Sequence, residues 1–336
     1  MTLRVAINGY GRIGRNFLRA VVARNAPGIE IVAINDLGNH EAVAHLTRFD
    51  STHGSLAEDV SLAGNMLVVG DRVIRVLSIA DPADCPWREI GVDLVIESTG
   101  VFRARADAAR HRLAGAKRVV IAAVAFDDVD AVLVPAVPPA TAALPATAEV
   151  LSAASCTTHC LAPVLTLLND AFGVERVLMT EIHAYTSDQQ LLDHVHRDLR
   201  RARAAASNII PTTSSSIAAI QKVLPWLAGR ITGYSVRVPT QNVALVDLSV
   251  ELSRPPTAQA INALFRDAAR GDWRGIVGYN DLPLVSGDFN HRGESAIFDA
   301  TETHFLGNFA KLMIWYDNEW GYANRLVDLC EALRGG

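Results

Sequence analysis

The stretch Leu3-Arg4-Val5-Ala6-Ile7-Asn8-Gly9-Tyr10-Gly11-Arg12-Ile13-Gly14 decides the fold of the first half of the chain. It predicts a short apolar strand, a glycine turn and the start of a helix that ends near Asn25. A second strand is predicted at residues 29–34, and Asp36 follows it. Strand, glycine turn, helix, strand and acid in this order are typical of a dinucleotide-binding unit.

Each glycine of this turn has its own physical task. Gly9 permits the tight turn, Gly11 lets the backbone approach a pyrophosphate, and Gly14 allows the helix to pack closely on the strand. The N-terminus of the helix supplies N–H groups to the phosphates. Asp36 lies where a carboxylate would accept hydrogen bonds from an adenosine ribose and repel a 2′-phosphate. The sequence therefore favours NAD, with NADP as an open alternative.

The alternation of strands and helices continues through the first half of the chain. A meander is predicted at residues 59–77, a helix at 104–115, and further strands at 93–98, 117–124, 131–134 and 150–154. We therefore expect an α/β fold with a Rossmann-type, doubly wound parallel sheet. Ligands bind at the carboxyl ends of such strands, so Gly9, Asp36 and Thr99 should share one rim.

The second half of the chain changes character after Glu175. Strands are predicted at residues 177–183, 233–237, 241–251, 294–300 and 310–316, with helices at 257–269 and 319–333. This pattern predicts a separate α+β catalytic domain with a largely antiparallel sheet. The expected domains are residues 1–154 for the dinucleotide and residues 155–318 for catalysis.

Composition excludes several classes of function. The chain has 336 residues and a net charge of −5, which gives no support to binding of nucleic acid or of an anionic membrane surface. Its four cysteines are scattered and show no spacing typical of a metal site, and such sparse use fits a reducing cytoplasm. No signal peptide and no apolar run of membrane-spanning length is expected.

The stretch Ser155-Cys156-Thr157-Thr158-His159-Cys160 lies between a predicted strand and a helix expected at residues 161–171. At such a junction, unpaired N–H groups and the helix dipole favour an anion, so the thiolate of Cys156 is expected to be stabilised. The flanking hydroxyls add donors for an oxyanion or a phosphate. The alternative is a small buried residue of a core helix.

Two further residues are candidates for the same site. His183 closes a predicted strand, where it is either a base for Cys156 or an ordinary core or surface histidine. Arg237 lies in an apolar strand, where its charge needs an anionic partner, either a ligand or a structural carboxylate.

Several stretches in the right order resemble the glyceraldehyde-3-phosphate dehydrogenase family, and the resemblance covers essentially the whole chain. The sister family, erythrose-4-phosphate dehydrogenase, shares most of them. The stretches are Ile7-Asn8-Gly9-Tyr10-Gly11-Arg12-Ile13-Gly14-Arg15, Ser155-Cys156-Thr157-Thr158, His183-Ala184-Tyr185-Thr186-Ser187-Asp188-Gln189, Asp198-Leu199-Arg200-Arg201-Ala202-Arg203-Ala204 and Trp315-Tyr316-Asp317-Asn318-Glu319-Trp320-Gly321-Tyr322.

The resemblance implies the phosphorylating, NAD-dependent oxidation of glyceraldehyde 3-phosphate to 1,3-bisphosphoglycerate, a reaction of glycolysis. Cys156 would be the nucleophile and His183 its activator. The implied cofactor-binding residues are Gly9, Gly11, Arg12, Ile13, Gly14, Asp36, Thr99, Gly100 and Asn318. The implied phosphate-binding residues are Thr186 and Arg237 for the substrate, and Ser155, Thr157, Arg201 and Ser214 for inorganic phosphate. The resemblance also implies a cytoplasmic homotetramer and a C-terminal helix, residues 319–336, that returns to the dinucleotide domain.

The chain departs from the family at several positions. Ser214-Ser215-Ser216 replaces a Thr-Gly-Ala phosphate loop, and His159 stands where asparagine is usual. A weakened phosphate site motivates the alternative, an erythrose-4-phosphate dehydrogenase in which water resolves the thioester. A degenerate, non-catalytic paralogue is a third hypothesis, and the retention of Cys156, His183 and Arg237 weighs against it.

Overall fold

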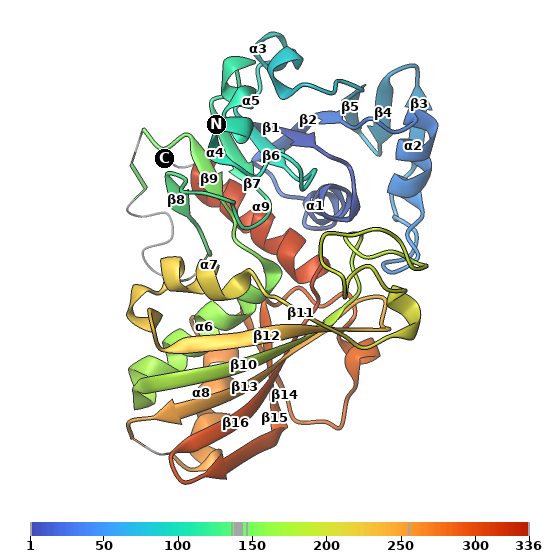
Figure 1. Cartoon of the computed structure of the whole chain (residues 1–336). Coiled ribbons are helices and arrows are strands. Elements are labelled where there is room, and N and C mark those ends of the chain that lie inside the picture. Colours follow the sequence, from blue (N-terminus) through green and yellow to red (C-terminus); the bar gives the residue numbers. More distant parts are fainter. Residues whose placement is uncertain (1, 136, 138–143, 146, 255, 335–336) are drawn as a thin grey trace. The chain divides into compact units, whose positions relative to one another are not determined.

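The computed structural model describes residues 2–135, 137, 144–145, 147–254 and 256–334 (Figure 1). The chain forms two compact units. Unit 1 comprises Met1–Ser155 with Ala323–Gly336, and unit 2 comprises Cys156–Tyr322. The division therefore falls one residue after the expected boundary at 154, and four residues after the expected boundary at 318.

Unit 1 is built on a nine-stranded sheet in the order β3-β4-β5-β2-β1-β6-β7-β9-β8. From β5 to β8 every pairing is parallel, whereas β3, β4 and β5 form the predicted antiparallel meander. The expected doubly wound parallel sheet is confirmed. The strands are β1 (Leu3–Asn8), β2 (Ile29–Asn35), β3 (Val60–Ala63), β4 (Met66–Val69), β5 (Arg72–Leu77), β6 (Leu94–Glu97), β7 (Arg118–Ile121), β8 (Ala131–Val132) and β9 (Val150–Ser152).

The helices of unit 1 flank this sheet. They are α1 (Arg12–Ala23), α2 (His40–Arg48), α3 (Trp87–Ile90), α4 (Arg105–Ala108) and α5 (Arg110–Leu113), with a short 3₁₀ turn η1 at Pro82–Asp84. The single helix expected at 104–115 is wrong, because it is interrupted at Ala109. There the N–H of Arg112 bonds to the carbonyl of Ala109, three residues back, which tightens the turn.

The last helix, α9 (Trp320–Arg334), has its C-terminal part in unit 1. Arg24, just after α1, forms ion pairs with Asp328 at 2.6 Å and Glu331 at 3.1 Å. Its guanidinium also donates to the carbonyl of Asn324. These contacts fix the end of α9 against α1. The expected extension to residue 336 lies outside the described residues.

Unit 2 holds a seven-stranded sheet in the order β11-β12-β10-β13-β16-β15-β14. Four of its pairings are antiparallel, and β10 with β12 and β14 with β15 are parallel, so the largely antiparallel expectation is confirmed. The strands are β10 (Val174–Ala184), β11 (Ile210–Thr212), β12 (Ile231–Val238), β13 (Ala244–Leu252), β14 (Val277–Asn280), β15 (Ala296–Leu306) and β16 (Phe309–Tyr316).

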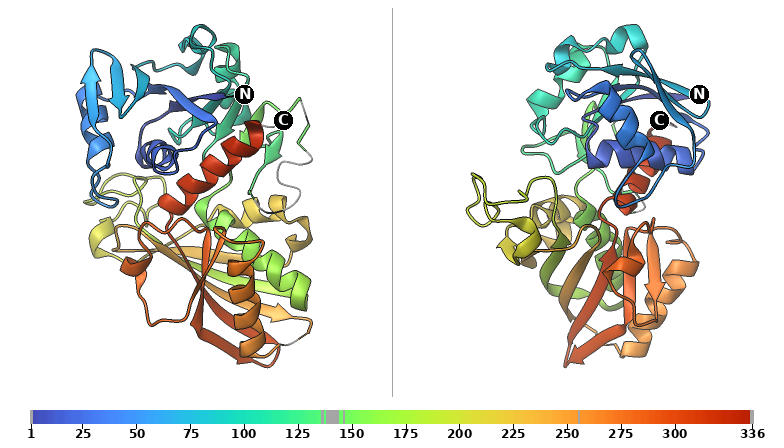
Figure 2. Two further views of the ribbon diagram at one scale, coloured as in Figure 1. Left: turned by 180° about the vertical axis from the view of Figure 1, so that it is seen from behind. Right: turned by 90° about the vertical axis from the view of Figure 1, so that its right-hand side faces the viewer.

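Helices α6 (Cys156–Phe172) and α8 (Ala258–Arg270) pack on this sheet (Figure 2). The N-cap Thr257 accepts a hydrogen bond from the N–H of Ala260, which fixes the start of α8. Phe265 on its buried face stacks on Phe298 of β15 with ring centroids 4.1 Å apart. The sequence did not predict α7 (Ser216–Val223), β11 or β14, because short segments of this kind carry little periodicity.

Within the part of the chain that the structure describes, no helix has the length and apolar character needed to cross a membrane.

Candidate active site

Cys156 is the first residue of α6, five residues before the expected start of that helix. The chain reaches it from β9 through Ala154, whose φ of +52° is the left-handed conformation that a residue with a Cβ rarely adopts. This sharp turn places the partly buried cysteine directly at the helix N-terminus, where the first N–H groups have no partner within the helix. Three residues thus separate the end of β9 at Ser152 from the start of α6 at Cys156.

His183 lies next to the last residue of β10, a central strand of the unit 2 sheet. Its neighbours in register are Arg237 on β12 and Ala244 on β13. The Nε2 atom of His183 is 3.6 Å from the Sγ atom of Cys156. The structure therefore brings together the cysteine and histidine that the sequence proposes as a pair, although they are 27 residues apart.

The second ring nitrogen of His183 fixes the orientation of the ring. Nδ1 is 2.6 Å from the carbonyl oxygen of Ala184 and 3.0 Å from Nη1 of Arg237. A guanidinium cannot accept a hydrogen bond, so only the carbonyl can take a proton from Nδ1. With Nδ1–H bonded to Ala184, Nε2 presents a lone pair to the sulfur. Burial, followed by the charge of Arg237, lowers the pKa of His183, which keeps the ring neutral and able to accept a proton.

A carboxylate that the sequence analysis did not single out lies beside this pair. Glu181 is two residues before His183 on β10, so both side chains point to the same face of the sheet. Its side chain is buried, with 3% of the residue exposed, and its Oε1 atom is 3.9 Å from Nε2 of His183. The two-residue period of the predicted strand is the signal that could have found it.

Hydroxyl groups surround the Glu181 carboxylate. The Oγ1 of Thr157 donates to it at 2.7 Å, and the hydroxyl of Ser214 donates as well. Because Thr157 has only one hydroxyl proton, it accepts from the hydroxyl of Tyr316 at 2.9 Å. Burial alone would raise the pKa of Glu181, but the charge of Arg237 and the hydrogen bonds from these hydroxyls lower it. The group is therefore a charged carboxylate.

The surroundings of Cys156 correct one expectation from the sequence. Burial, followed by the nearby charge of Glu181, raises the pKa of the Cys156 thiol to about 12, against the opposing effect of Thr157 and Arg237. These surroundings favour the neutral thiol, whereas the helix N-terminus predicts a stabilised thiolate. The thiol needs an acceptor for its proton, and Nε2 of His183 is positioned to be that acceptor.

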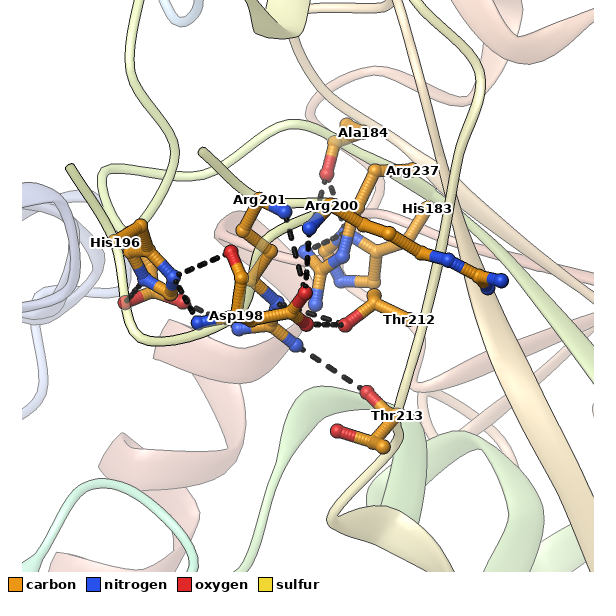
Figure 3. A network of polar contacts seen from close by, with 10 residues as sticks. His183, Ala184, His196, Asp198, Arg200, Arg201, Thr212, Thr213 and Arg237 are labelled. Atoms are coloured by element: carbon orange, nitrogen blue, oxygen red, sulfur yellow. Dashed lines mark hydrogen bonds and ion pairs between the residues drawn. The ribbon is translucent and has the colours of Figure 1, made fainter. Parts of the chain in front are cut away.

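Figure 3 shows His183 and Ala184 from close by, together with Arg237, Arg201 and the loop that carries Asp198. Arg237 donates from Nη1 to the carbonyl of Ala184 at 3.3 Å, and its buried Nε atom has no partner among the described residues. Arg201 donates from Nε to Thr212 at 2.9 Å and forms an ion pair with Asp188. The guanidinium of Arg201 thus bonds to Thr212 and Asp188, whereas the Nε–H of Arg237 can still donate a hydrogen bond to a ligand.

The predicted cofactor residues of unit 1 lie on the turn between β1 and α1. Gly9 has a φ of +87°, and a Cβ added there would lie 2.5 Å from the backbone nitrogen of Thr99. A Cβ on Gly14 would lie 2.3 Å from the carbonyl oxygen of Gly9. At Gly11, in contrast, a Cβ would meet no atom within 4 Å among the described residues. The turn is tightly packed on two sides and open at its centre.

Side chains around the turn stabilise its shape. Asp36 accepts from the N–H of Tyr10 at 2.7 Å and from the N–H of Gly38 at 2.8 Å. The guanidinium of Arg12, at the start of α1, forms an ion pair with the buried Asp50. Thr99 donates its N–H to Glu97 at 2.8 Å, and the following Gly100 has a φ of +75°.

The remaining predicted residues lie in unit 2 or at its border. Asn318 is 7% exposed, and its buried Oδ1 atom has no hydrogen-bond partner within the described part of the chain. Thr186 follows the end of β10, and its carbonyl accepts from the N–H of Gln189. Ser155, the last residue of the first segment of unit 1, is partly buried. The structure thus leaves one acceptor on Asn318 available for a ligand amide.

Two family models match the chain. Residues 3–105 match the NAD binding domain of glyceraldehyde 3-phosphate dehydrogenase, and residues 155–318 match its C-terminal domain. The chain is 50% identical over 330 residues to glyceraldehyde-3-phosphate dehydrogenase 1 of Bacillus subtilis, with 98% of this chain and 97% of that protein covered. It is 50% identical over 334 residues to the plasmid-encoded glyceraldehyde-3-phosphate dehydrogenase of Cupriavidus necator, with 99% of each covered. Identity to the Mycobacterium avium protein of the same name is 49%, with 98% of each covered.

Proposed function

The chain belongs to the glyceraldehyde-3-phosphate dehydrogenase family of NAD-dependent oxidoreductases, and from that premise we propose that it oxidises glyceraldehyde 3-phosphate through a thioester on Cys156. The observation that carries the proposal is the 3.6 Å approach of Nε2 of His183 to Sγ of Cys156 at the N-terminus of α6. A neutral thiol beside a neutral, buried imidazole is a nucleophile with its base.

The first step adds the cysteine to the aldehyde. As Sγ forms a bond to the carbonyl carbon, His183 takes the thiol proton on Nε2, and the carbonyl oxygen gains negative charge. We propose that the N-terminus of α6 supports that charge, because Cys156 is the first residue of this helix. His183 then gives the thiol proton to that oxygen, so the product of this step is a neutral hemithioacetal on Cys156.

The second step converts the hemithioacetal into a thioester. When bound, NAD supplies the acceptor for the hydride that leaves the substrate carbon. His183 accepts the hydroxyl proton of the hemithioacetal as that hydride departs, after it has released the thiol proton. The thioester is the intermediate from which any acyl acceptor must start.

The residues of unit 1 suit this cofactor. The open space at Gly11 leaves room for a pyrophosphate against the backbone, and the first turn of α1 at Arg12 and Ile13 offers N–H groups to it. Asp36 is the proposed partner of the adenosine ribose. The unpartnered Oδ1 of Asn318 is the proposed acceptor for the amide of the nicotinamide.

In the proposed reaction, inorganic phosphate attacks the thioester and releases 1,3-bisphosphoglycerate. Its proposed contacts are Ser155, Thr157, Arg201 and Ser214. Thr186 and Arg237 are proposed to bind the phosphate of the substrate itself, and the unpartnered Nε of Arg237 supports its part. When the C–S bond breaks, its electron pair stays on Sγ of Cys156 as a thiolate, which takes the proton that His183 holds.

Steady-state kinetics test the proposal. Purified protein is mixed with NAD and glyceraldehyde 3-phosphate, and in parallel with erythrose 4-phosphate, the substrate of the alternative. The proposal expects NADH formation with a higher kcat/KM for the three-carbon aldehyde. Absence of NADH formation with that aldehyde would refute it, and a preference for the four-carbon aldehyde would support the alternative.

The family also motivates a proposal about assembly and location. We propose that the protein is a cytoplasmic homotetramer. The mass expected for the assembly is set by the mass of one chain, 36.2 kDa. Light scattering of the purified protein should report about four times that mass. A monomeric mass would contradict the proposal.

A further inference from the structure

A buried carboxylate lies next to the proposed cofactor turn of unit 1. Glu97 is the last residue of β6, is 1% exposed, and forms no ion pair with a lysine or an arginine within the described part of the chain. Its Oε1 atom accepts from the N–H of Thr99 at 2.8 Å and from the Thr99 hydroxyl. Its Oε2 atom accepts from Nδ2 of Asn8 at 2.6 Å and lies 3.1 Å from Nε2 of His111. A buried carboxylate without a cation has to be satisfied by such donors, so these four groups fix its position.

The proton of His111 is directed toward Glu97 by Trp87. The indole Nε1 of Trp87 can only donate, and it donates to Nδ1 of His111 at 2.9 Å. Nδ1 therefore carries no proton, and Nε2 carries the proton that is donated to Glu97. Trp87 and His111 are both 0% exposed, so bulk water cannot replace either bond.

The amide of Asn8 is oriented from the opposite side. Oδ1 of Asn35 accepts from the backbone N–H of Ile79 at 2.9 Å, so Nδ2 of Asn35 faces Asn8. Oδ1 of Asn8 accepts from that Nδ2 at 2.7 Å, which leaves Nδ2 of Asn8 to donate to Glu97. Asn35, Asn8 and Glu97 are the last residues of β2, β1 and β6, which are neighbours in the sheet (Figure 1). One buried network thus joins three adjacent strand ends, and the direction of each of its hydrogen bonds is determined.

This network reaches the glycine turn through Thr99. The N–H and the hydroxyl of Thr99 both donate to Glu97, and Oγ1 of Thr99 accepts from the N–H of Val101 at 3.0 Å. Thr99 thus has no donor left for a ligand. Its backbone instead packs against the turn, because a Cβ added to Gly9 would lie 2.5 Å from the backbone nitrogen of Thr99. The position of Thr99 therefore constrains the conformation of the turn at Gly9.

We propose that Glu97 is a positioning residue for NAD, which holds Thr99, and through it the turn at Gly9, in the conformation that binds the dinucleotide. The inference rests on the proposed roles of Gly9, Thr99 and Gly100 in cofactor binding. Because Glu97 is 1% exposed, it acts through Thr99 and not by contact with the cofactor. Its loss should therefore weaken NAD binding and leave the chemical step at Cys156 unchanged.

The Glu97→Gln variant tests this inference. Its amide nitrogen would face either the N–H of Thr99 or the donors of Asn8 and His111, and none of these donors can become an acceptor without breaking a further bond. Calorimetric titration of the purified protein with NAD should give a Kd about tenfold or more above the wild-type value. In kinetics with glyceraldehyde 3-phosphate, KM for NAD should rise similarly, whereas kcat at saturating NAD should stay within about twofold. An unchanged Kd for NAD would overturn the inference.

Asp93→Asn is the matched control, because Asp93 directly precedes the same strand at its other end. Asp93 accepts from the N–H of Arg4 at 3.0 Å and forms an ion pair with Lys117 at 2.7 Å, so its loss also weakens unit 1. It lies roughly 13 Å along the strand from Glu97. Its NAD affinity should equal that of the wild type even if its melting temperature falls. Equal losses of NAD affinity in Asp93→Asn and Glu97→Gln would show that only the stability of unit 1 matters, which would overturn the inference.

A second pair of variants keeps the test decisive if Glu97→Gln does not fold. Thr99→Val removes the hydroxyl that Glu97 holds, whereas Thr99→Ser keeps it. Thr99→Val should bind NAD about threefold or more weakly than Thr99→Ser, and equal affinities would overturn the inference. Titration with NAD requires no turnover, so it also separates this inference from the proposed function. A wild type that binds NAD but forms no NADH from the aldehyde would refute the proposed oxidation, and a raised Kd in Glu97→Gln would still support the role of Glu97.

Discussion

Two helix N-termini of this chain are prepared for anions in opposite ways. The N-terminus of α1 follows Gly11, where the space in front of the backbone is open. The N-terminus of α6 begins at Cys156, and the hydroxyl of its second residue, Thr157, already bonds to the carboxylate of Glu181. We propose that the first receives an external phosphate, for which the open space at Gly11 leaves room. At the N-terminus of α6, an external phosphate would have to compete with the Glu181 carboxylate for the hydroxyl of Thr157.

This difference teaches that a helix N-terminus does not by itself define a phosphate site. First-turn N–H groups that have no acceptor within their own helix, and the helix dipole, are common to both helices. What distinguishes them is whether the neighbouring donors are still available. At α1 the glycine turn removes side chains, whereas at α6 the packing of β10 adds a buried carboxylate.

The largest expected effect is the loss of the nucleophile at α6. Cys156→Ala should lower kcat by a factor of about 10⁴ or more, because no other group there can form the thioester. Cys160→Ala is the matched control, since Cys160 is buried one turn later on the same helix. NADH formation by both variants checks this. Equal losses in the two would show that helix packing, and not the Cys156 thiol, is what matters.

His183→Asn should have the next largest effect, about 10²- to 10⁴-fold on kcat. Burial raises the pKa of Cys156, and the variant lacks the imidazole that accepts the thiol proton. Alkylation of Cys156 by iodoacetamide should therefore require a higher pH in the variant than in the wild type. The exposed His304→Asn serves as control. An unchanged pH profile in His183→Asn would exclude His183 as the proton acceptor.

Substitutions at two glycines sharpen the account of α1. Gly11→Ala should leave the melting temperature unchanged yet weaken NAD binding about tenfold, because the new methyl group fills only the open space. Gly9→Ala should lower both, since its Cβ would collide with Thr99 at a backbone φ of +87°. Calorimetry and titration with NAD measure the two effects. Unchanged NAD affinity in Gly11→Ala would argue against a phosphate at this turn.

The smallest expected effect concerns the ion pair at the start of α1. Burial alone would raise the pKa of Asp50, but hydrogen bonds from Arg12, His53 and Thr52 hold that pKa well below its usual range. A depressed pKa stabilises the fold above the ordinary carboxyl pKa of about 4 and ceases to do so as the pH falls further. Asp50→Asn should thus lower the melting temperature by roughly 2–4 °C at pH 7. The difference in melting temperature between the wild type and Asp50→Asn should become smaller below about pH 4. A difference that does not change with pH would contradict this account.

Local signals in the sequence predict the fold class and the Cys156–His183 pair of the candidate active site. The glycine turn predicts β1, α1 and the acid at Asp36 because turn geometry, helix start and strand length are encoded within about 35 neighbouring residues. The candidate pair Cys156 and His183 also follows from local context, namely a strand end next to hydroxyls. Neither required knowledge of how distant strands pair.

The rest of the site depends on packing that no local pattern encodes. The sequence pattern predicts that this helix begins at residue 161, whereas α6 begins at Cys156. The polar residues 155–159 lack the apolar periodicity from which a helix start is predicted. The sequence pattern does not single out Glu181, because a glutamate in a strand is usually exposed and its partners Thr157 and Ser214 lie in other parts of the chain. The raised pKa of Cys156 follows from its own burial and from the charge of Glu181, neither of which a local sequence pattern encodes.

The most direct test of the account is a single-turnover reaction that follows Cys156 itself. The protein is mixed with excess NAD and one equivalent of glyceraldehyde 3-phosphate, quenched in acid within milliseconds, and mapped by peptide mass spectrometry. We predict one NADH per chain and a phosphoglyceroyl adduct on the peptide that carries Cys156, absent from Cys156→Ala. NADH formed without that adduct, or an adduct on another residue, would contradict the central claim.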